Sequence, residues 1–244
     1  MSDLATALRE ATERFAAAGV PSPRADAELL AAHLLGCGRG EVLVALARGD
    51  ALDEDRQARW NTLVERRAAR TPLQHLTGRA PFRRIEVAVG PGVFVPRAET
   101  EVLAGLAIEE ANALSPSEVV VVDLCTGSGA VALAIADEVP RARVVALELD
   151  PAALTWARRN VAELPAGQRV ELRPGDAIGA DRAALADLVG AVDVVVANPP
   201  YIPPDAVPVE AEVAGHDPAV ALYGGGADGL EVPRGVVAAA EQLL

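Results

Sequence analysis

The stretch VVVVDLCTGSGA, residues 119–130, decides the fold of this 244-residue chain. Its four valines form a short apolar run, which is typical of a strand buried on both faces. The run leads through Asp123 into a loop with Gly127 and Gly129, and a helical pattern begins at Ala130. Glycines let the main chain approach a ligand closely, and the free N–H groups at the start of a helix favour an anion. The stretch therefore predicts a strand, a ligand-binding loop and a helix.

The same order of elements repeats along the rest of the chain. Apolar runs alternate with helical patterns, as expected of parallel strands joined by crossover helices. The expected strands are Val119–Asp123, Arg143–Glu148, Arg169–Arg173 and Val192–Asn198, and the expected helices are Glu101–Leu114, Ala130–Glu138, Pro151–Ala162 and Arg182–Val189. This predicts an α/β domain with a parallel sheet, whose ligands bind at the carboxyl ends of the strands.

The first part of the chain reads as helical. Apolar residues recur at helical spacing over four segments, Leu4–Gly19, Pro23–Gly36, Glu41–Ala47 and Asp53–Arg70. Thr71 and Pro72 end this pattern, and alternating apolar residues around the turn Gly90-Pro91-Gly92 predict a β-hairpin. We expect a helical bundle over residues 1–75, a hairpin linker over 76–96 and the α/β domain over 97–244.

The composition excludes several classes of protein. With 51% hydrophobic and 23% charged residues the chain should fold, and no apolar stretch is long enough to cross a bilayer, so we expect a soluble, cytoplasmic protein. All 22 basic residues are arginine, which excludes chemistry that needs a lysine amine. Cys37 and Cys125 lie far apart without clustered histidines, so we expect neither a disulfide framework nor a metal site.

The net charge of −13 is unevenly distributed. Residues 1–79 contain 11 acidic and 11 basic side chains, whereas residues 80–244 contain 24 acidic and 11 basic ones. Nonspecific nucleic-acid affinity comes mainly from lysine and arginine, so this acidic second part makes DNA or RNA a poor partner.

Acidic residues follow the expected strands where a nucleotide cofactor would bind. Glu148 is placed to accept hydrogen bonds from both ribose hydroxyls, whereas Asp150 before Pro151 reads mainly as a helix N-cap. Asp176 either accepts from an adenine amino group or caps a turn. Because Gly127-x-Gly129-x-x-Ala132 also satisfies a loose dinucleotide fingerprint, the loop alone leaves the identity of the cofactor open.

The fourth strand ends in Asn198-Pro199-Pro200-Tyr201, the most informative segment of the chain. The prolines fix their own φ angles, and each pushes the residue before it to extended geometry. The Asn198 side-chain oxygen and the Pro199 carbonyl can each accept one hydrogen from a planar NH₂ group, and the Tyr201 ring can pack on that plane. A proline-rich turn is the structural alternative.

The glycine loop Asp123–Gly129 and the segment Asn198–Tyr201 together resemble the S-adenosylmethionine-dependent methyltransferases that modify adenine N6 or glutamine N5. Further segments narrow the resemblance to the release-factor glutamine N5-methyltransferases, known as PrmC or HemK. These segments are TPLQH (71–75) with Gly78 and Phe82, VPRAETE (95–101), DPAVAL (217–222) and GGGADGL (224–230). The resemblance runs from about residue 20 to the last residue.

The resemblance implies a five-helix N-terminal domain, a hairpin linker and a Rossmann-like methyltransferase domain. It implies S-adenosyl-L-methionine as cofactor, S-adenosyl-L-homocysteine as product and the Gly-Gly-Gln glutamine of peptide chain release factors as substrate. The cofactor-binding residues would be Asp123, Cys125, Thr126, Gly127, Ser128, Gly129, Glu148, Asp176, Ala177 and Asn198. The catalytic residues would be Asn198, Pro199, Pro200 and Tyr201. We expect a monomer.

The chain departs from the family pattern at two points. Cys125 stands where the family usually has a glycine, which should restrict backbone approach slightly. The family also normally continues beyond a helix such as Glu231–Leu244 to supply the last strands of its sheet, so the methyltransferase domain is expected to lack those strands. An exposed strand edge of this kind invites pairing.

Other functions fit the residues less well. A dehydrogenase needs a proton-handling group near its cofactor, and this sequence has no lysine and no histidine at a strand end. An adenine N6-methyltransferase would need a basic groove, and a noncatalytic binding module would not need Asn198. Methylation of a ribosomal-protein glutamine remains open.

Residues near the linker have two readings each. The arginines at 66, 67, 70, 79, 83 and 84 form either a docking surface for the protein substrate or a solvated charge run. Arg97, Glu99 and Thr100 either close the cofactor pocket or form structural pairs, and Phe94 packs either on the cofactor or in the hairpin core.

Overall fold

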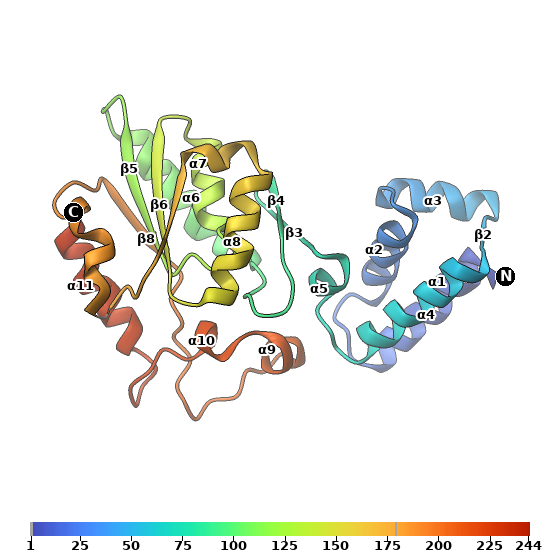
Figure 1. Ribbon diagram of the computed structural model, residues 1–244. Helices are drawn as coiled ribbons and strands as arrows, with labels where there is room; N and C mark the ends of the chain where they lie inside the picture. The colour runs from blue at the N-terminus through green and yellow to red at the C-terminus, as the bar shows by residue number, and fades with distance from the viewer. Residues whose placement is uncertain (1, 179) are drawn as a thin grey trace. The chain divides into compact units, whose positions relative to one another are not determined.

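The computed structural model describes residues 2–178 and 180–244 (Figure 1). The chain forms two compact units. One comprises Met1–Gly78 together with Val209–His216, and the other comprises Arg79–Pro208 together with Asp217–Leu244. The domain ranges expected from the sequence, 1–75, 76–96 and 97–244, stay a prediction. Among the described residues no single helix is long and apolar enough to cross a membrane, and only the bent pair of helices Pro23–Leu35 and Arg39–Arg48 passes that test jointly.

The first unit is a helical bundle. Its helices are α1 (Leu4–Ala17), α2 (Pro23–Leu35), α3 (Arg39–Arg48), α4 (Glu54–Ala68), α5 (Leu73–Thr77) and α9 (Ala211–His216). Two short strands, β1 (Ser2–Asp3) and β2 (Ala51–Leu52), pair antiparallel. Local sequence sets the helix ends, since Pro23 occupies the first turn of α2 and Gly36 ends it in the left-handed conformation. Phe15, Leu30 and Trp60 lie in the shared core.

A buried ion cluster joins α9 to this bundle and corrects the expectation for Arg67. Arg67 lies 2.7 Å from Asp26 and 2.8 Å from Glu212, and Arg70 pairs with the same glutamate. Although burial raises the pKa of Glu212, hydrogen bonds from Arg70 and Arg67 lower it to about 2. Arg67 is only 4% exposed. It therefore belongs neither to a docking surface nor to a solvated run, because its guanidinium group is paired with Asp26 and Glu212 inside the unit.

The remaining arginines of that group differ among themselves. Arg79 pairs with Glu163, while Arg83 and Arg84 both face Glu138. Arg66 is exposed. Of the six arginines, Arg66 is therefore the clearest candidate for a contact with the protein substrate.

The second unit is built on a parallel four-stranded sheet with the order β7-β6-β5-β8. Its strands are β5 (Val119–Leu124), β6 (Ala142–Glu148), β7 (Val170–Pro174) and β8 (Val194–Ala197). Alternate side chains point to opposite faces, so Val121 packs in one core and Val122 in the other. This explains why the strands read as continuous apolar runs.

Helices cover both faces of this sheet (Figure 1). One core contains α6 (Ala98–Ala113), α7 (Ala130–Glu138) and α8 (Pro151–Glu163), with the turn η1 (Pro165–Arg169). The other contains η2 (Ala180–Leu188) and α11 (Glu231–Leu243). The Rossmann-like α/β arrangement predicted from the sequence is confirmed.

Two details of the prediction were wrong. The hairpin strands β3 (Arg79–Phe82) and β4 (Ile85–Ala88) turn at residues 83–84 instead of 90–92. Gly90 instead provides room for the Trp156 ring, whose Nε1 donates to the Pro91 carbonyl at 3.2 Å. The segment expected as a helix over 182–189 is the 3₁₀ helix η2. Leu185 and Leu188, three residues apart, are both buried, as the 3₁₀ period of three residues allows.

Candidate active site

The loop after β5 adopts a conformation that suits glycine. Cys125, Gly127 and Gly129 have φ angles of 65°, 59° and 83°. Gly129 is the N-cap of α7, so the first turn of that helix begins directly behind the loop. Cys125 thus adopts a glycine-like conformation despite its side chain, which costs about 1–2 kcal/mol. Its backbone is therefore strained, and the expected slight restriction of backbone approach stays a prediction.

Side chains hold this loop from below. The Thr126 hydroxyl donates to the Asp123 carboxylate at 2.6 Å, and the Thr126 N–H donates to the Leu147 carbonyl at 3.0 Å. Asp123 and Ser128 are buried. The loop is therefore fixed on its inner side, while a Cβ at Gly127 would meet nothing within 4 Å.

Glu148 at the end of β6 contacts the loop directly. One carboxylate oxygen accepts from the Gly127 N–H at 2.7 Å, and the other accepts from the Asp150 N–H at 2.8 Å. Asp150 itself accepts from two N–H groups in the first turn of α8, which confirms the N-cap interpretation. Glu148 therefore faces the glycine loop and Asp150 the helix.

The acidic groups beneath the loop interact electrostatically. Burial raises the pKa of Asp123 to about 7, against hydrogen bonds from Thr126 and Ala132 that lower it. Burial also raises the pKa of Glu148. Burial and these nearby carboxylates raise the pKa of the Cys125 thiol to about 12, so this cysteine is not a nucleophile at neutral pH.

Asp176 and Ala177 follow β7 at the same edge of the sheet. The Asp176 carboxylate accepts from the Ile178 N–H at 2.9 Å, which forms the turn expected as its structural role. Ala177 is buried against the core that contains Leu147 and Leu185. One oxygen of Asp176 is used in the turn, so a contact with an adenine would fall to the other.

The corner after β8 brings the predicted catalytic residues to the neighbouring strand end. β8 pairs with β5 up to Ala197, and Asn198 to Pro200 leave the sheet half-buried. The Asn198 amide nitrogen contacts the Thr100 hydroxyl at 3.5 Å. This contact directs the nitrogen towards α6 and leaves the Asn198 oxygen available as an acceptor. Tyr201 is 62% exposed.

Thr100 and Arg97 have more definite roles than the sequence gave them. Thr100 contacts Asn198, which makes it one of the structural pairs that the sequence allowed. Arg97 forms an ion pair with the buried Asp217 at 2.7 Å and lies 5.2 Å above the Phe94 ring. The motif segments around residues 95–101 and 217–222 signalled these contacts, but no spacing rule predicted their pairing.

The residues at these strand ends fit a nucleoside with a carboxylate. The N-terminus of α7, directly behind the left-handed loop, offers N–H groups to the carboxylate, and Glu148 offers oxygens suited to ribose hydroxyls. Open space lies over Gly127. In the described part of the chain no group of three His, Cys, Asp or Glu side chains could hold a metal ion.

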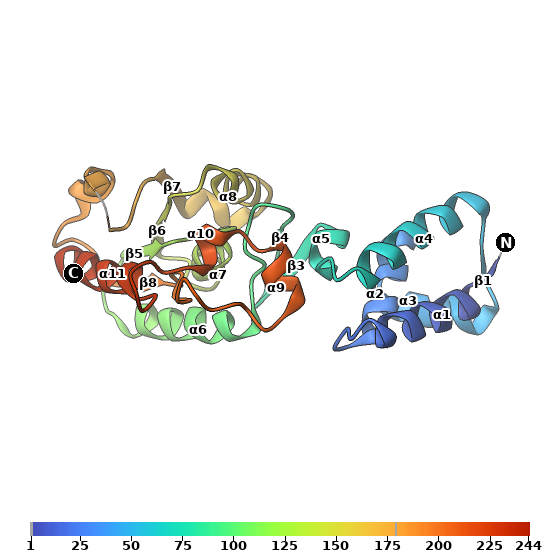
Figure 2. The ribbon, with the colours of Figure 1, turned by 90° about the horizontal axis from the view of Figure 1, so that it is seen from below.

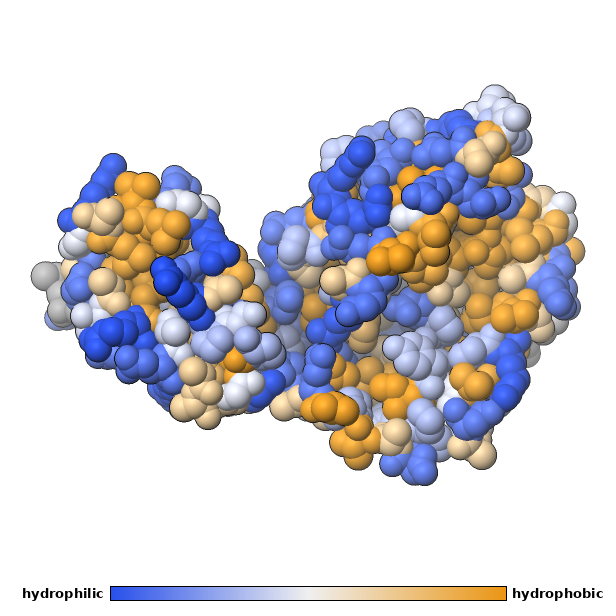
Figure 3. Space-filling model, turned by 180° about the vertical axis from the view of Figure 1, so that it is seen from behind, coloured by the Kyte–Doolittle hydropathy of each residue, from blue (hydrophilic) through white to orange (hydrophobic). Residues whose placement is uncertain are grey.

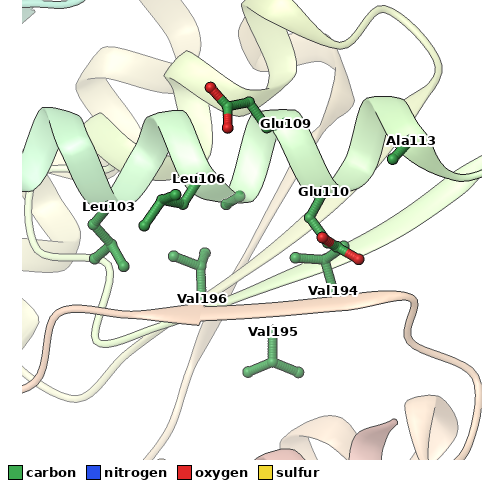
Figure 4. A pocket seen from close by; sticks show the side chains of 9 residues that line it. Leu103, Leu106, Glu109, Glu110, Ala113, Val194, Val195 and Val196 are labelled. Carbon is green, nitrogen blue, oxygen red and sulfur yellow. The ribbon is translucent and has the colours of Figure 1, made fainter.

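A separate groove lies between α6 and β8 (Figure 4). Leu103 and Leu106 point from the helix towards Val194 and Val196 on the strand. None of the predicted site residues lines it. Apolar side chains also reach the molecular surface in patches among hydrophilic ones (Figure 3). The groove is thus distinct from the polar strand ends.

Comparison with known proteins identifies both parts of the chain. A family model described as "PrmC N-terminal domain" matches residues 6–78, and one described as "Methyltransferase small domain" matches residues 85–213. A putative S-adenosyl-L-methionine-dependent methyltransferase from Methanococcus maripaludis, of known structure, is 18% identical over 41% of this chain and 42% of its own, with a TM-score of 0.34.

Curated relatives match over the whole chain. The release factor glutamine methyltransferase of Streptomyces coelicolor is 52% identical and that of Mycolicibacterium smegmatis 50% identical, each over 100% of this chain and 82% of the relative. That of Mycobacterium tuberculosis is 45% identical over 99% of this chain and 74% of the relative. The chain is therefore a methyltransferase and belongs to the release factor glutamine methyltransferase family, as its motifs indicated.

Proposed function

We propose that this chain transfers the methyl group of S-adenosyl-L-methionine to the side-chain amide nitrogen (N5) of the glutamine in the Gly-Gly-Gln motif of peptide chain release factors. Family membership supports the reaction. The observation that carries it at atomic level is the Asn198 corner, whose acceptor oxygen lies at the strand end next to the glycine loop.

In this proposal the cofactor binds at the ends of β5, β6 and β7. The loop Cys125–Gly129 and the N-terminus of α7 hold the cofactor carboxylate, and Glu148 holds the ribose hydroxyls. Asp123, Thr126 and Ser128 keep the loop in place, while Asp176 and Ala177 border the adenine. When bound, the cofactor supplies an electrophilic methyl group on a positively charged sulfur.

The corner activates a poor nucleophile. An amide nitrogen is unreactive because its lone pair is delocalised into the carbonyl. Asn198 Oδ1 and the Pro199 carbonyl each accept one N–H of the substrate amide, which raises the electron density on nitrogen and aims it at the methyl group. Tyr201 covers the amide plane once substrate is present. No strong base is required, because the nitrogen becomes acidic as the methyl transfers and its proton passes to water.

The helical unit docks the protein substrate in this proposal. The exposed Arg66 is its clearest free cation among the arginines considered, and glycines beside the target glutamine let the substrate main chain enter a narrow site. The acidic α/β part disfavours nucleic acid. We propose a monomer that works in the cytoplasm, where translation termination takes place.

Product analysis tests this function. The purified chain is incubated with methyl-labelled cofactor and a release factor, and the labelled peptide is fragmented in a mass spectrometer. We expect label on the Gly-Gly-Gln glutamine and none on a release factor whose glutamine is replaced by alanine. Label on a ribosomal protein or on adenine, with an unlabelled release factor, would contradict the proposal.

A further inference from the structure

The glycine-rich segment 224–229 packs directly against the catalytic corner. A Cβ on Gly224 would overlap the Gly229 carbonyl oxygen and would lie 2.6 Å from the Pro200 oxygen and 2.8 Å from Tyr201 Cα. A Cβ on Gly229 would lie 2.6 Å from the Pro203 nitrogen and 2.7 Å from the Tyr201 oxygen. Real Cβ atoms do not approach main chain so closely, so only glycine permits this packing.

Main-chain hydrogen bonds join the same two segments. Pro199 and Pro200 carry no N–H, so the first amides after Asn198 that can anchor the corner belong to Tyr201 and Ile202. Both donate to the Leu222 carbonyl, at 3.2 Å and 2.8 Å. In return, the Gly224 N–H donates to the Ile202 carbonyl at 3.1 Å. The corner is therefore held by hydrogen bonds to the neighbouring segment that contains Leu222 and Gly224.

That segment, residues 217–229, is itself fixed at two further points, and we call it the strap. At one end the buried Asp217 pairs with Arg97 at 2.7 Å. Further along the strap, the Gly224 carbonyl accepts from the Val232 N–H at 2.8 Å, where α11 begins. Helix α11 packs against the sheet through Val236, Ala239 and Leu243. Figure 2 shows α10 (Ala219–Leu222), which belongs to the strap, crossing the end of the sheet.

We propose that Gly224 and Gly229 are positioning residues for methyl transfer. By allowing the strap to contact the main chain of residues 200–203, they set the position of the Asn198 and Pro199 oxygens. This inference rests on the proposed function, which gives those oxygens the substrate amide as their partner. A displacement of about 1 Å in such a site lowers turnover by up to about 100-fold.

Gly224→Ala tests the proposal, with Gly167→Ala as its matched control. Neither glycine has a positive φ angle. The control adds the same methyl group against a main-chain oxygen, that of Val161, in η1 rather than at the corner. We expect Gly224→Ala to lower kcat about tenfold or more, with the KM for release factor and the cofactor Kd within about threefold of wild type. Gly167→Ala should keep the wild-type kcat at a temperature where both variants are folded.

Hydrogen exchange provides a measurement independent of activity. The Tyr201 and Ile202 amides should exchange slowly in wild type and in Gly167→Ala, and faster in Gly224→Ala. If Gly224→Ala does not fold, Asp217→Asn releases the other end of the strap and should speed exchange at the same two amides while lowering kcat.

The outcomes separate the two proposals. If wild type methylates release factor and Gly224→Ala turns over as fast as Gly167→Ala, the positioning role is wrong and the proposed function stands. If exchange at Tyr201 and Ile202 is unchanged in Gly224→Ala, the strap does not hold the corner. If wild type leaves the glutamine unmethylated, the proposed function is wrong.

Discussion

The ends of two neighbouring strands, β5 and β8, carry opposite hydrogen-bonding groups. After β5 the chain passes through three left-handed residues to the N-cap of α7, where the N–H groups of the first helical turn have no intrahelical acceptor. After β8 the chain enters two prolines, which have no N–H, so this end presents oxygens. One strand end is a donor and the other an acceptor.

The two ends are also held differently. Buried side chains hold the β5 end, through Thr126 on Asp123 and Glu148 on Gly127. Main chain holds the β8 end, through Leu222 and Gly224. The difference indicates that the β5 end suits an anionic cofactor and the β8 end an NH₂ group, so substitutions at the two ends should have separable effects.

The largest effect is expected at the acceptor end. Asn198→Ala removes one of the two substrate acceptors and should lower kcat about 100-fold or more, as for loss of a preorganised polar group. The cofactor Kd should stay within about threefold of wild type, because the donor end is intact. Steady-state kinetics and titration calorimetry measure the two quantities. A large loss of cofactor affinity with unchanged kcat would show that Asn198 serves the cofactor instead.

The converse effect is expected at Glu148. Glu148→Gln replaces an acceptor oxygen with a donor facing an N–H group, so the cofactor Kd should rise about 10- to 100-fold. Turnover at saturating cofactor should change less. Asp150→Asn is the matched control, because Asn still caps α8 and Asp150 does not contact the loop through its side chain. Equal cofactor affinity for both variants would contradict the assignment of Glu148.

Stability should depend on pH through Asp123. Its pKa rises from an ordinary 3.8 to about 7 on folding, so between these values the folded state keeps a proton that the unfolded state has lost. Wild type should therefore lose stability as pH rises from about 4 to about 7, with no further loss from this group above that. Asp123→Asn should lack this loss and be about 4 kcal/mol more stable relative to wild type near pH 8 than near pH 4.

Urea unfolding of both proteins at the two pH values measures this difference. The Thr126 hydroxyl can donate to or accept from the new amide, so the loop should survive the change. A difference in stability that does not vary with pH would show that Asp123 is ionised in the folded protein.

The smallest effect is expected at Cys125. Cys125→Gly relieves a left-handed φ angle of 65° but adds freedom to the unfolded chain, so stability should rise by about 0.5–1 kcal/mol. Cofactor affinity should not change, because the thiol is neutral and the backbone already has the glycine-like conformation. Thermal unfolding with and without cofactor measures both the stability and the cofactor affinity. A destabilised variant would mean that packing of the cysteine side chain stabilises the fold by more than the backbone strain destabilises it.

Much of the fold follows from local patterns in the sequence. Continuous valine runs predicted the buried parallel strands, and Asp150-Pro151 predicted the start of α8, because both depend on residues close in sequence. The hairpin turn was misplaced because Gly90 makes room for the Trp156 ring. Trp156 lies 66 residues later in the chain, so the alternation of nearby apolar residues gives no sign of this contact.

The same distinction applies to the candidate site. The motif residues at the strand ends were predicted because each follows an apolar run. The contacts between them, Thr100 with Asn198 and Gly224 with Tyr201, join segments about 20 to 100 residues apart. The role of Arg67 was missed for the same reason, since its partner Glu212 lies 145 residues away.

The most direct test of the account is a structure of the chain with S-adenosyl-L-homocysteine and a peptide that contains Gly-Gly-Gln. We predict the carboxylate of the nucleoside at the Gly127 loop, its ribose on Glu148, and the glutamine nitrogen about 3 Å from both Asn198 Oδ1 and the Pro199 oxygen. A complex in which the glutamine amide binds elsewhere, or in which Asn198 points away from the sulfur, would contradict it.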